Sequence, residues 1–102
     1  MTWVTVARAG DVAPSTAHVV EADGRRLALC NTGEGIYAID DVCTHDGGPL
    51  DQGKLEGKEI ECPRHGARFD VTTGRALCLP AIRPVKTYAT RLTGEAIEVE
   101  IP

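Results

Sequence analysis

The chain has 102 residues, of which 42% are hydrophobic, and a formal net charge of −4 at neutral pH. This length suits one domain, and the hydrophobic share excludes a disordered chain. Because no apolar run approaches the roughly eighteen residues of a membrane span and no basic stripe is present, we expect no membrane and no nucleic acid among its partners.

The first half of the chain predicts antiparallel strands. Residues 16–30 (TAHVVEADGRRLALC) predict two strands joined at Asp23-Gly24, a dipeptide typical of tight hairpin turns. Residues 31–35 (NTGEG) then turn the chain into a short apolar strand at residues 36–40 (IYAID). Ahead of the hairpin, residues 8–16 (RAGDVAPST) predict one short helical turn before a proline.

The second half continues the β pattern. Strands are predicted at residues 58–62 (KEIEC), 67–71 (ARFDV), 85–92 (VKTYATRL) and 96–101 (AIEVEI), with hairpin turns at 72–74 (TTG) and 93–95 (TGE). Strands at this spacing predict an all-β fold, an antiparallel sandwich or small barrel. The segment from about Asp41 to Pro84 is richer in Gly, Pro, Cys and His, which indicates a small site-bearing insertion in the β scaffold.

Four side chains in this insertion are candidate metal ligands. They form the pairs Cys43-x-His45 and Cys62-x-x-His65. The N-terminus lacks the basic region and long apolar core of a secretory signal, so we expect a cytoplasmic protein. Thiols stay reduced there, and the cysteines therefore indicate a metal rather than a disulfide framework.

The spacing of these ligands leaves two kinds of metal centre open. Structural zinc sites usually take a close cysteine pair from one limb and a close histidine pair from the other, but a mixed zinc site is chemically possible. Two mixed limbs suit a [2Fe–2S] cluster better, with both thiolates on one iron and both imidazoles on the other. Tight loops that bring backbone close to sulfur are favoured by Gly47, Gly48, Pro49, Pro63 and Gly66.

The segment from about Val42 to Gly74 resembles the Rieske iron–sulfur signature, through CTH, then CPRHG, FD and TG. This resemblance implies an all-β Rieske-like domain. It has a basal β-barrel at about 1–40 and 85–102 and a cluster-binding subdomain at about 41–84. It also implies one [2Fe–2S] cluster, ligated by Cys43, His45, Cys62 and His65.

Departures from the signature indicate which members the chain resembles. High-potential respiratory members have motifs similar to CTHxGC…CPCHGSxY. In them a disulfide joins the two loops, and hydroxyl groups donate hydrogen bonds to the cluster and to its cysteine ligand. Here Gly48 and Arg64 replace the two bridging cysteines, and Ala67 and Phe69 replace the hydroxyl donors. Lost hydrogen bonds to sulfur lower the reduction potential, so we expect a value on the order of −150 mV. This is similar to the ferredoxins of bacterial oxygenases.

The remaining residues favour an electron carrier over an enzyme. A non-haem iron oxygenase needs two further histidines and a carboxylate, but only His18 remains. A nucleotide-binding GxGxxG motif is also missing, which argues against a reductase. The resemblance implies that a flavin-dependent, NAD(P)H-oxidising reductase supplies the electron and that a terminal oxygenase of the aromatic-ring dioxygenase type receives it. We expect a monomer that docks transiently through Thr44–Pro49 and Arg64–Ala67, with Leu79 and Pro80 alongside.

Two other functions fit the same residues. The domain also resembles the small Rieske subunit of assimilatory nitrite reductases, which is a permanent subunit rather than a free carrier. If the four ligands bind zinc instead, the chain is an interaction module without a redox role.

Four further residues have ordinary structural interpretations. Cys30 lies in an apolar strand and is predicted to be a small buried hydrophobe. Cys78 is predicted to pack in the core or beside the cluster segment. His18 is predicted to be a surface residue of a strand, and Trp3 a packing residue in the core or at the barrel edge.

Overall fold

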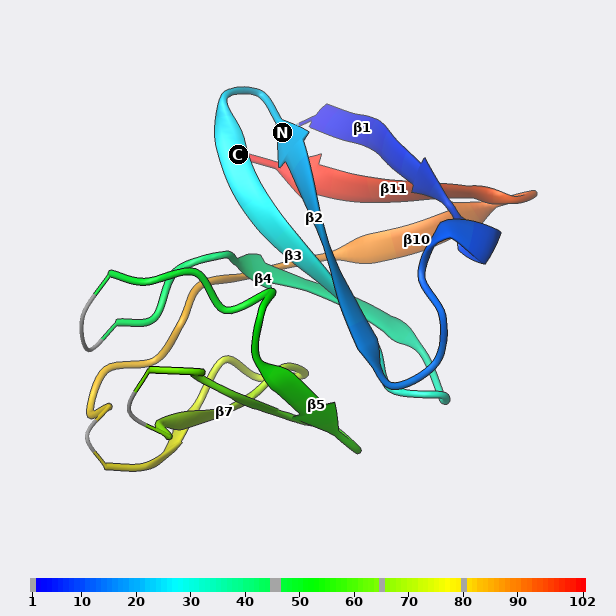
Figure 1. Cartoon of the computed structure of the whole chain (residues 1–102). Coiled ribbons are helices and arrows are strands. Elements are labelled where there is room, and N and C mark those ends of the chain that lie inside the picture. Colours follow the sequence, from blue (N-terminus) through cyan, green and yellow to red (C-terminus); the bar gives the residue numbers. More distant parts are fainter. Residues whose placement is uncertain (1, 45–46, 65, 80) are drawn as a thin grey trace.

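A computed structural model describes residues 2–44, 47–64, 66–79 and 81–102, which form three antiparallel sheets (Figure 1). The first sheet has the order β1 (Thr2–Arg8), β11 (Ala96–Ile101), β10 (Thr90–Thr93). The second has the order β2 (Thr16–Ala22), β3 (Arg25–Asn31), β4 (Ile36–Asp40), β9 (Thr87–Tyr88). The third has the order β5 (Lys54–Glu56), β6 (Glu59–Glu61), β7 (Arg68–Asp70), β8 (Ala76–Cys78). The predicted all-β antiparallel fold is confirmed.

The predicted hairpin between β2 and β3 is confirmed together with its turn. Ala22 pairs with Arg25, so Asp23 and Gly24 alone form the loop. Both loop residues have positive φ, at 52° and 74°. This is the two-residue turn whose twist matches the flanking strands. The predicted helical turn is confirmed as a 3-10 helix, η1 (Ala9–Asp11).

The strand prediction for residues 85–92 is wrong, because the chain changes sheets within this segment. β9 pairs with β4, and β10 pairs with β11. Ala89 lies between the two strands, and its carbonyl accepts a hydrogen bond from the Glu100 N–H at 3.0 Å. Three further strands, β1, β5 and β8, lie outside the predicted strands.

β3 and β4 are buried on both faces and separate two hydrophobic cores. Leu27, Leu29 and Ala38 point into the first core, between the two upper sheets of Figure 1, whereas Ala28, Cys30 and Ile39 belong to the second. A strand covered on both sides reads as a continuous apolar run. This explains why residues 27–30 (LALC) are hydrophobic without alternation.

The second core joins β3 and β4 to the β5–β8 sheet. The first two sheets together are called the barrel below. It contains Ala28, Cys30, Ile39, Cys43, Leu50, Leu55, Ile60, Cys62, Ala67, Phe69, Val71, Ala81 and Val85. Both candidate cysteine ligands are therefore core residues. The division at about residues 41 and 84 stays a prediction. The strands of the β5–β8 sheet lie between those positions, and the other strands lie outside them.

Gly74 fastens the β5–β8 sheet to the segment that leads into β9. Its φ is 82°, and an added Cβ would lie 2.1 Å from the Val85 carbonyl oxygen. The Val85 N–H donates to the Gly74 oxygen at 2.8 Å, so neither backbone moves away easily.

We expect Gly74→Ala to lower the free energy of unfolding by about 3 kcal/mol or more, because backbone strain and a backbone clash add together. The matched control is Gly24→Ala, which has φ 74° with nothing within 4 Å of an added Cβ. That variant should lose only about 1 kcal/mol. Chemical denaturation of the two variants measures the difference, and equal losses would contradict the clash.

Candidate metal centre

Both predicted ligand loops begin at a buried cysteine and close with the same pair of backbone hydrogen bonds. In the first loop, the Cys43 N–H donates to the Gly48 oxygen at 2.7 Å, and the Gly47 N–H donates to the Cys43 oxygen at 2.7 Å. Gly47 has φ 76°, a conformation that glycine adopts at little cost. The predicted tight loop is thereby confirmed.

The second loop repeats this frame with the same residue spacing. The Cys62 N–H donates to the Ala67 oxygen at 2.6 Å, and the Gly66 N–H donates to the Cys62 oxygen at 3.0 Å. Gly66 has φ 77°, matching the glycine of the first loop. The two loops are therefore closed by the same pattern of backbone hydrogen bonds, and each begins at a cysteine.

The two cysteine side chains lie in the second core, with relative exposures of 0% for Cys43 and 1% for Cys62. The predicted histidine ligands, His45 and His65, lie outside the described residues. Within the described ranges, no three His, Cys, Asp or Glu side chains gather as metal ligands. A bare thiolate is costly in an apolar core, and a bound metal cation offsets this cost. The two loops therefore offer two soft sulfur donors that suit an iron–sulfur cluster.

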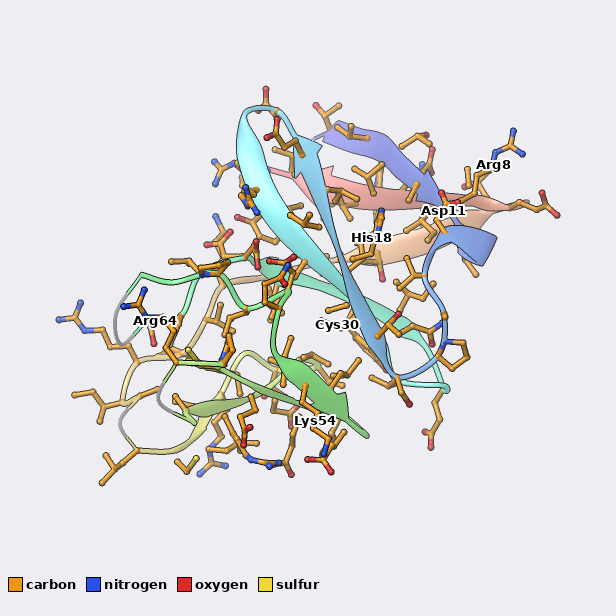
Figure 2. All side chains as sticks on the ribbon, in the orientation of Figure 1. Arg8, Asp11, His18, Cys30, Lys54 and Arg64 are labelled. Atoms are coloured by element: carbon orange, nitrogen blue, oxygen red, sulfur yellow. The ribbon has the colours of Figure 1, made fainter. Side chains whose placement is uncertain are left out.

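Cys30 shares this core but differs in its chemistry. The prediction of a small buried hydrophobe is confirmed, since its exposure is 0% and its Sγ lies 3.9 Å from the Ala28 oxygen. Burial, and next the Asp41 carboxylate, raise the pKa of the Cys30 thiol to about 12. Cys30 therefore stays protonated at neutral pH and is a poor metal ligand. Figure 2 shows it on β3, within the barrel half of the molecule.

Cys78 is exposed, so the prediction that it packs in the core is wrong. It ends β8, the edge strand of its sheet, where one side of the strand has no neighbouring strand. Its Sγ donates to the Gly66 oxygen at 3.6 Å. The expected closeness to the second ligand loop is therefore confirmed.

The positions of the missing hydroxyl donors lie in the second core, which also contains the two cysteines. Ala67 and Phe69 are both fully buried, and they belong to the same group of packed residues as Cys43 and Cys62. Neither side chain has a hydrogen-bond donor. These two core positions therefore offer no hydroxyl donor, as the sequence indicates.

Two described residues outside the ligand loops contact them. The Thr44 hydroxyl of the first loop donates to the Arg83 oxygen at 2.7 Å, and the Cys78 Sγ donates to the Gly66 oxygen of the second loop at 3.6 Å. Near these two residues in the chain, Leu79 and Ile82 are large apolar residues that are 76% and 79% exposed. Pro80, also predicted at the docking face, lies outside the described residues.

Sequence reasoning missed Asp41, a buried carboxylate two residues before Cys43. Its side chain has 0% exposure and bonds Arg26 of β3. Its partner lies 15 residues earlier in the chain, so the local sequence around Asp41 does not identify the pair.

The other predictions for single residues are confirmed. His18 is exposed on β2 and lies away from the loop end of the molecule, where Figure 2 shows Arg64. Trp3 is half-buried on the edge strand β1, with the Arg91 guanidinium 4.1 Å from the centre of its ring. This packing is typical of a barrel edge.

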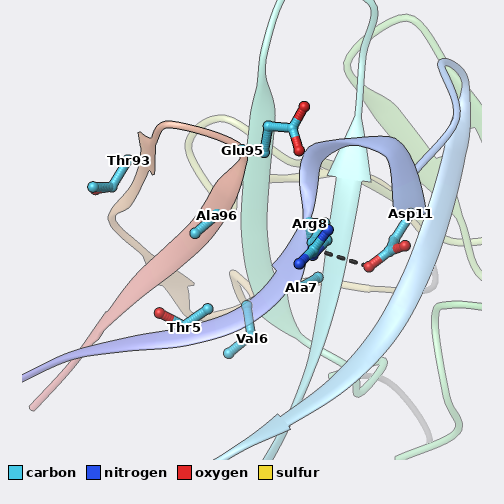
Figure 3. A pocket seen from close by; sticks show the side chains of 8 residues that line it. All are labelled: Thr5, Val6, Ala7, Arg8, Asp11, Thr93, Glu95 and Ala96. Atoms are coloured by element: carbon cyan, nitrogen blue, oxygen red, sulfur yellow. Dashed lines mark hydrogen bonds between the residues drawn. The ribbon is translucent and has the colours of Figure 1, made fainter.

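One open hollow of the surface lies elsewhere. It has a volume of about 720 Å³ and is lined by Thr5, Val6, Ala7, Arg8, Asp11, Thr93, Glu95 and Ala96 (Figure 3). Asp11 already accepts a hydrogen bond from the Arg8 backbone N–H at 2.9 Å. The hollow contains no cysteine and is separate from the ligand loops. In the described residues, no helix is both long and apolar enough to cross a membrane.

Comparison with known proteins gives a consistent result. The Rieske [2Fe–2S] domain family matches residues 2–89. The ferredoxin component of a naphthalene 1,2-dioxygenase system from Pseudomonas aeruginosa is 38% identical over 99 residues, covering 97% of this chain and 95% of that protein. The ferredoxin of carbazole 1,9a-dioxygenase from Nocardioides aromaticivorans superposes with a TM-score of 0.92 at 36% identity, covering 97% of both chains. A chain in a complex of reduced oxygenase and oxidized ferredoxin of carbazole 1,9a-dioxygenase has a TM-score of 0.89 at 35% identity, covering 95% of this chain and 91% of that one.

Proposed function

The chain belongs to the Rieske [2Fe–2S] domain family, and from this premise we propose that it is the ferredoxin component of an aromatic-ring dioxygenase system. Its single [2Fe–2S] cluster accepts one electron and passes it on. The chain carries electrons and does not itself oxidise the substrate. The observation that supports this most strongly is the pair of loops closed by the same backbone hydrogen bonds, each of which begins at a buried cysteine.

The ligand set that we propose is Cys43, His45, Cys62 and His65. The residues fit a histidine-ligated cluster, because two thiolates and two neutral imidazoles balance the charge of two ferric irons and two sulfides. The apolar core around the two cysteines keeps water from the sulfurs. With Ala67 and Phe69 in the same core, the chain provides no hydroxyl donor at these positions, which supports a potential near the low end of the Rieske range.

The partners follow from the same assignment. We propose that a flavin-dependent, NAD(P)H-oxidising reductase donates the electron and that a terminal non-haem iron oxygenase accepts it, in the cytoplasm. The related complex of oxygenase and ferredoxin supports the second partner. Repeated exchange of partners favours a monomer with weak and transient docking.

The two alternatives differ in what they predict. A nitrite reductase subunit would be purified within a large enzyme, whereas the relatives with more than 35% identity over nearly the whole chain are named ferredoxin components. A zinc-binding module would be colourless and would contain stoichiometric zinc.

The test of the proposed function is a visible and EPR spectrum of the purified chain, before and after reduction with dithionite. We expect a red-brown protein that bleaches partially and then gives the low average g-value of a histidine-ligated [2Fe–2S] centre. A colourless, EPR-silent protein after anaerobic cluster reconstitution would overturn the proposal.

The docking face that we propose consists of the loops at Thr44–Pro49 and Arg64–Gly66 together with Leu79 and Ile82. Ala67, which the sequence analysis included in this face, is fully buried and is left out. We expect the double change Leu79→Ser and Ile82→Ser to slow reduction of the oxygenase by about tenfold, because two apolar side chains buried on docking contribute more than 1.4 kcal/mol. Stopped-flow mixing of reduced ferredoxin with a related oxygenase measures this rate.

The matched control for the docking face is Leu92→Ser. Leu92 is also apolar and 58% exposed, but it lies on β10 in the barrel. Its replacement should leave the rate unchanged, and all variants should keep the wild-type potential. Equal slowing by the control would contradict this docking face.

A further inference from the structure

The Asp41 carboxylate closes a wider loop, residues 42–49, that contains the first ligand loop. It follows β4 directly, and its Oδ1 accepts the backbone N–H groups of Leu50 at 2.9 Å and Asp51 at 2.8 Å. These two residues end the loop that begins after Asp41 and carries Cys43. One oxygen atom therefore closes a loop of eight intervening residues.

The second carboxylate oxygen connects this closed loop to the barrel. Oδ2 accepts a hydrogen bond from Arg26 Nε at 3.0 Å, and the Asp41 N–H donates to the Arg26 backbone oxygen at 3.1 Å. Arg26 lies on β3, in the sheet that separates the two cores. The pair is a buried anion with a cation whose side chain is 59% exposed.

This arrangement has a consequence for a redox centre. A buried negative charge is screened little by solvent, so it opposes the arrival of another electron nearby. Arg26 offsets part of that charge from the solvent side. Removal of the Asp41 charge therefore makes the local charge more positive, and removal of the Arg26 charge makes it more negative. Both changes loosen the same contact.

We propose that Asp41, paired with Arg26, is a positioning residue that fixes the first ligand loop to the barrel and lowers the reduction potential of the cluster. This inference rests on the proposed function, because it concerns residues around the proposed cluster. Asp41 is not one of the four proposed ligands. It acts through the backbone of Leu50 and Asp51 and through its charge.

The first experiment compares Asp41→Asn with Arg26→Gln by redox titration of the cluster-loaded proteins. Asparagine keeps an oxygen acceptor for the two backbone N–H groups but removes the charge and leaves Arg26 without its anion. We expect the equilibrium constant for reduction to rise by about tenfold, which is 59 mV for one electron. Arg26→Gln leaves the anion without its cation and should lower that constant by about threefold.

The opposite signs separate charge from simple loosening, which would move both variants in the same direction. The matched control is Asp70→Asn. Asp70 is the other buried carboxylate of the described chain, 7% exposed, and it pairs with Lys58 at 3.5 Å. It bonds the Thr72 backbone N–H, in a turn that carries no proposed ligand. We expect less than a twofold change in the reduction equilibrium for this variant.

A second measurement tests the positioning role without a redox readout. In Asp41→Ala the two backbone N–H groups lose their acceptor, so hydrogen exchange of the peptide containing Leu50 and Asp51 in the cluster-loaded protein should become about tenfold faster. Asp70→Ala should not change this peptide.

Three results would overturn the inference. The first is a shift of the reduction potential with the same sign in Asp41→Asn and Arg26→Gln. The second is a potential shift in Asp41→Asn that is no larger than in Asp70→Asn, and the third is unchanged hydrogen exchange at Leu50 and Asp51 in Asp41→Ala. Failure of the proposed function looks different, because the wild-type protein would then lack the [2Fe–2S] spectrum altogether.

Discussion

Replacement of Cys62 by alanine abolishes the visible absorption and the EPR signal of the cluster, whereas replacement of Cys30 by alanine leaves both intact. This is the largest effect that we expect from a single substitution. Both cysteines are buried in the same core, with exposures of 1% and 0%, so burial alone does not distinguish them. The difference is that Cys62 is at the root of a ligand loop, whereas Cys30 lies within β3 with a thiol pKa of about 12.

The measurement is iron and sulfide content per chain, together with the spectra, after anaerobic reconstitution. Cys43→Ala should behave as Cys62→Ala does, and so should alanine at His45 or His65. Cys30→Ala should cost only about 1 kcal/mol of stability, since a single sulfur atom leaves a small cavity. An intact cluster in Cys62→Ala, or iron loss in Cys30→Ala, would contradict the ligand set.

Local signals in the sequence predicted the elements that depend on local geometry. The hairpin at Asp23-Gly24 and the paired loop glycines, Gly47 and Gly66, are positions where positive φ is required and the residue type reveals it. Each half of the proposed ligand set is also local in sequence, because one residue separates Cys43 from His45 and two residues separate Cys62 from His65. For this reason the two limbs were recognisable before any fold was known.

Features that depend on distant partners were not predictable in the same way. The apolar alternation of residues 85–92 continues across a change of sheet at Ala89, and periodicity does not show which neighbour a strand pairs with. Cys78 resembles a core residue in its apolar context, yet β8 is an edge strand. Asp41 was missed because its partner, Arg26, is distant in sequence and becomes adjacent only through the β3–β4 pairing.

One sheet of the structure contributes to both cores. β3 and β4 present one face to the barrel core and the other to the core around Cys43 and Cys62. The ligand loops therefore rest on a rigid sheet rather than on other loops. A site supported in this way keeps its geometry when an electron arrives, which favours rapid electron transfer.

Replacement of Phe69 by tyrosine should raise the reduction potential by about 60 mV. Phe69 is fully buried on β7, in the same core as Cys43 and Cys62. The motif of the high-potential Rieske proteins has a tyrosine at the matching position. A hydroxyl that donates to a cysteine ligand stabilises the more negative, reduced state. One such bond contributes about 1.4 kcal/mol, a tenfold change in the reduction equilibrium, and 59 mV corresponds to tenfold for one electron. Ala67→Ser adds a second donor, so the double variant should rise by about 120 mV.

The control for this prediction is Phe69→Leu, which alters packing in the same core but adds no donor. Redox titration of the three variants and the wild type measures the midpoint potentials. If packing governed the potential, leucine and tyrosine would shift it by similar amounts, and the hydrogen-bond explanation would fail. If hydrogen-bond donors govern the potential, only the hydroxyl variants have a higher midpoint potential. That increase then depends on a proton that is shared with sulfur. Because deuterium changes the strength of such a bond, the potentials of the hydroxyl variants should then differ slightly between H₂O and D₂O, beyond the difference seen for the leucine variant.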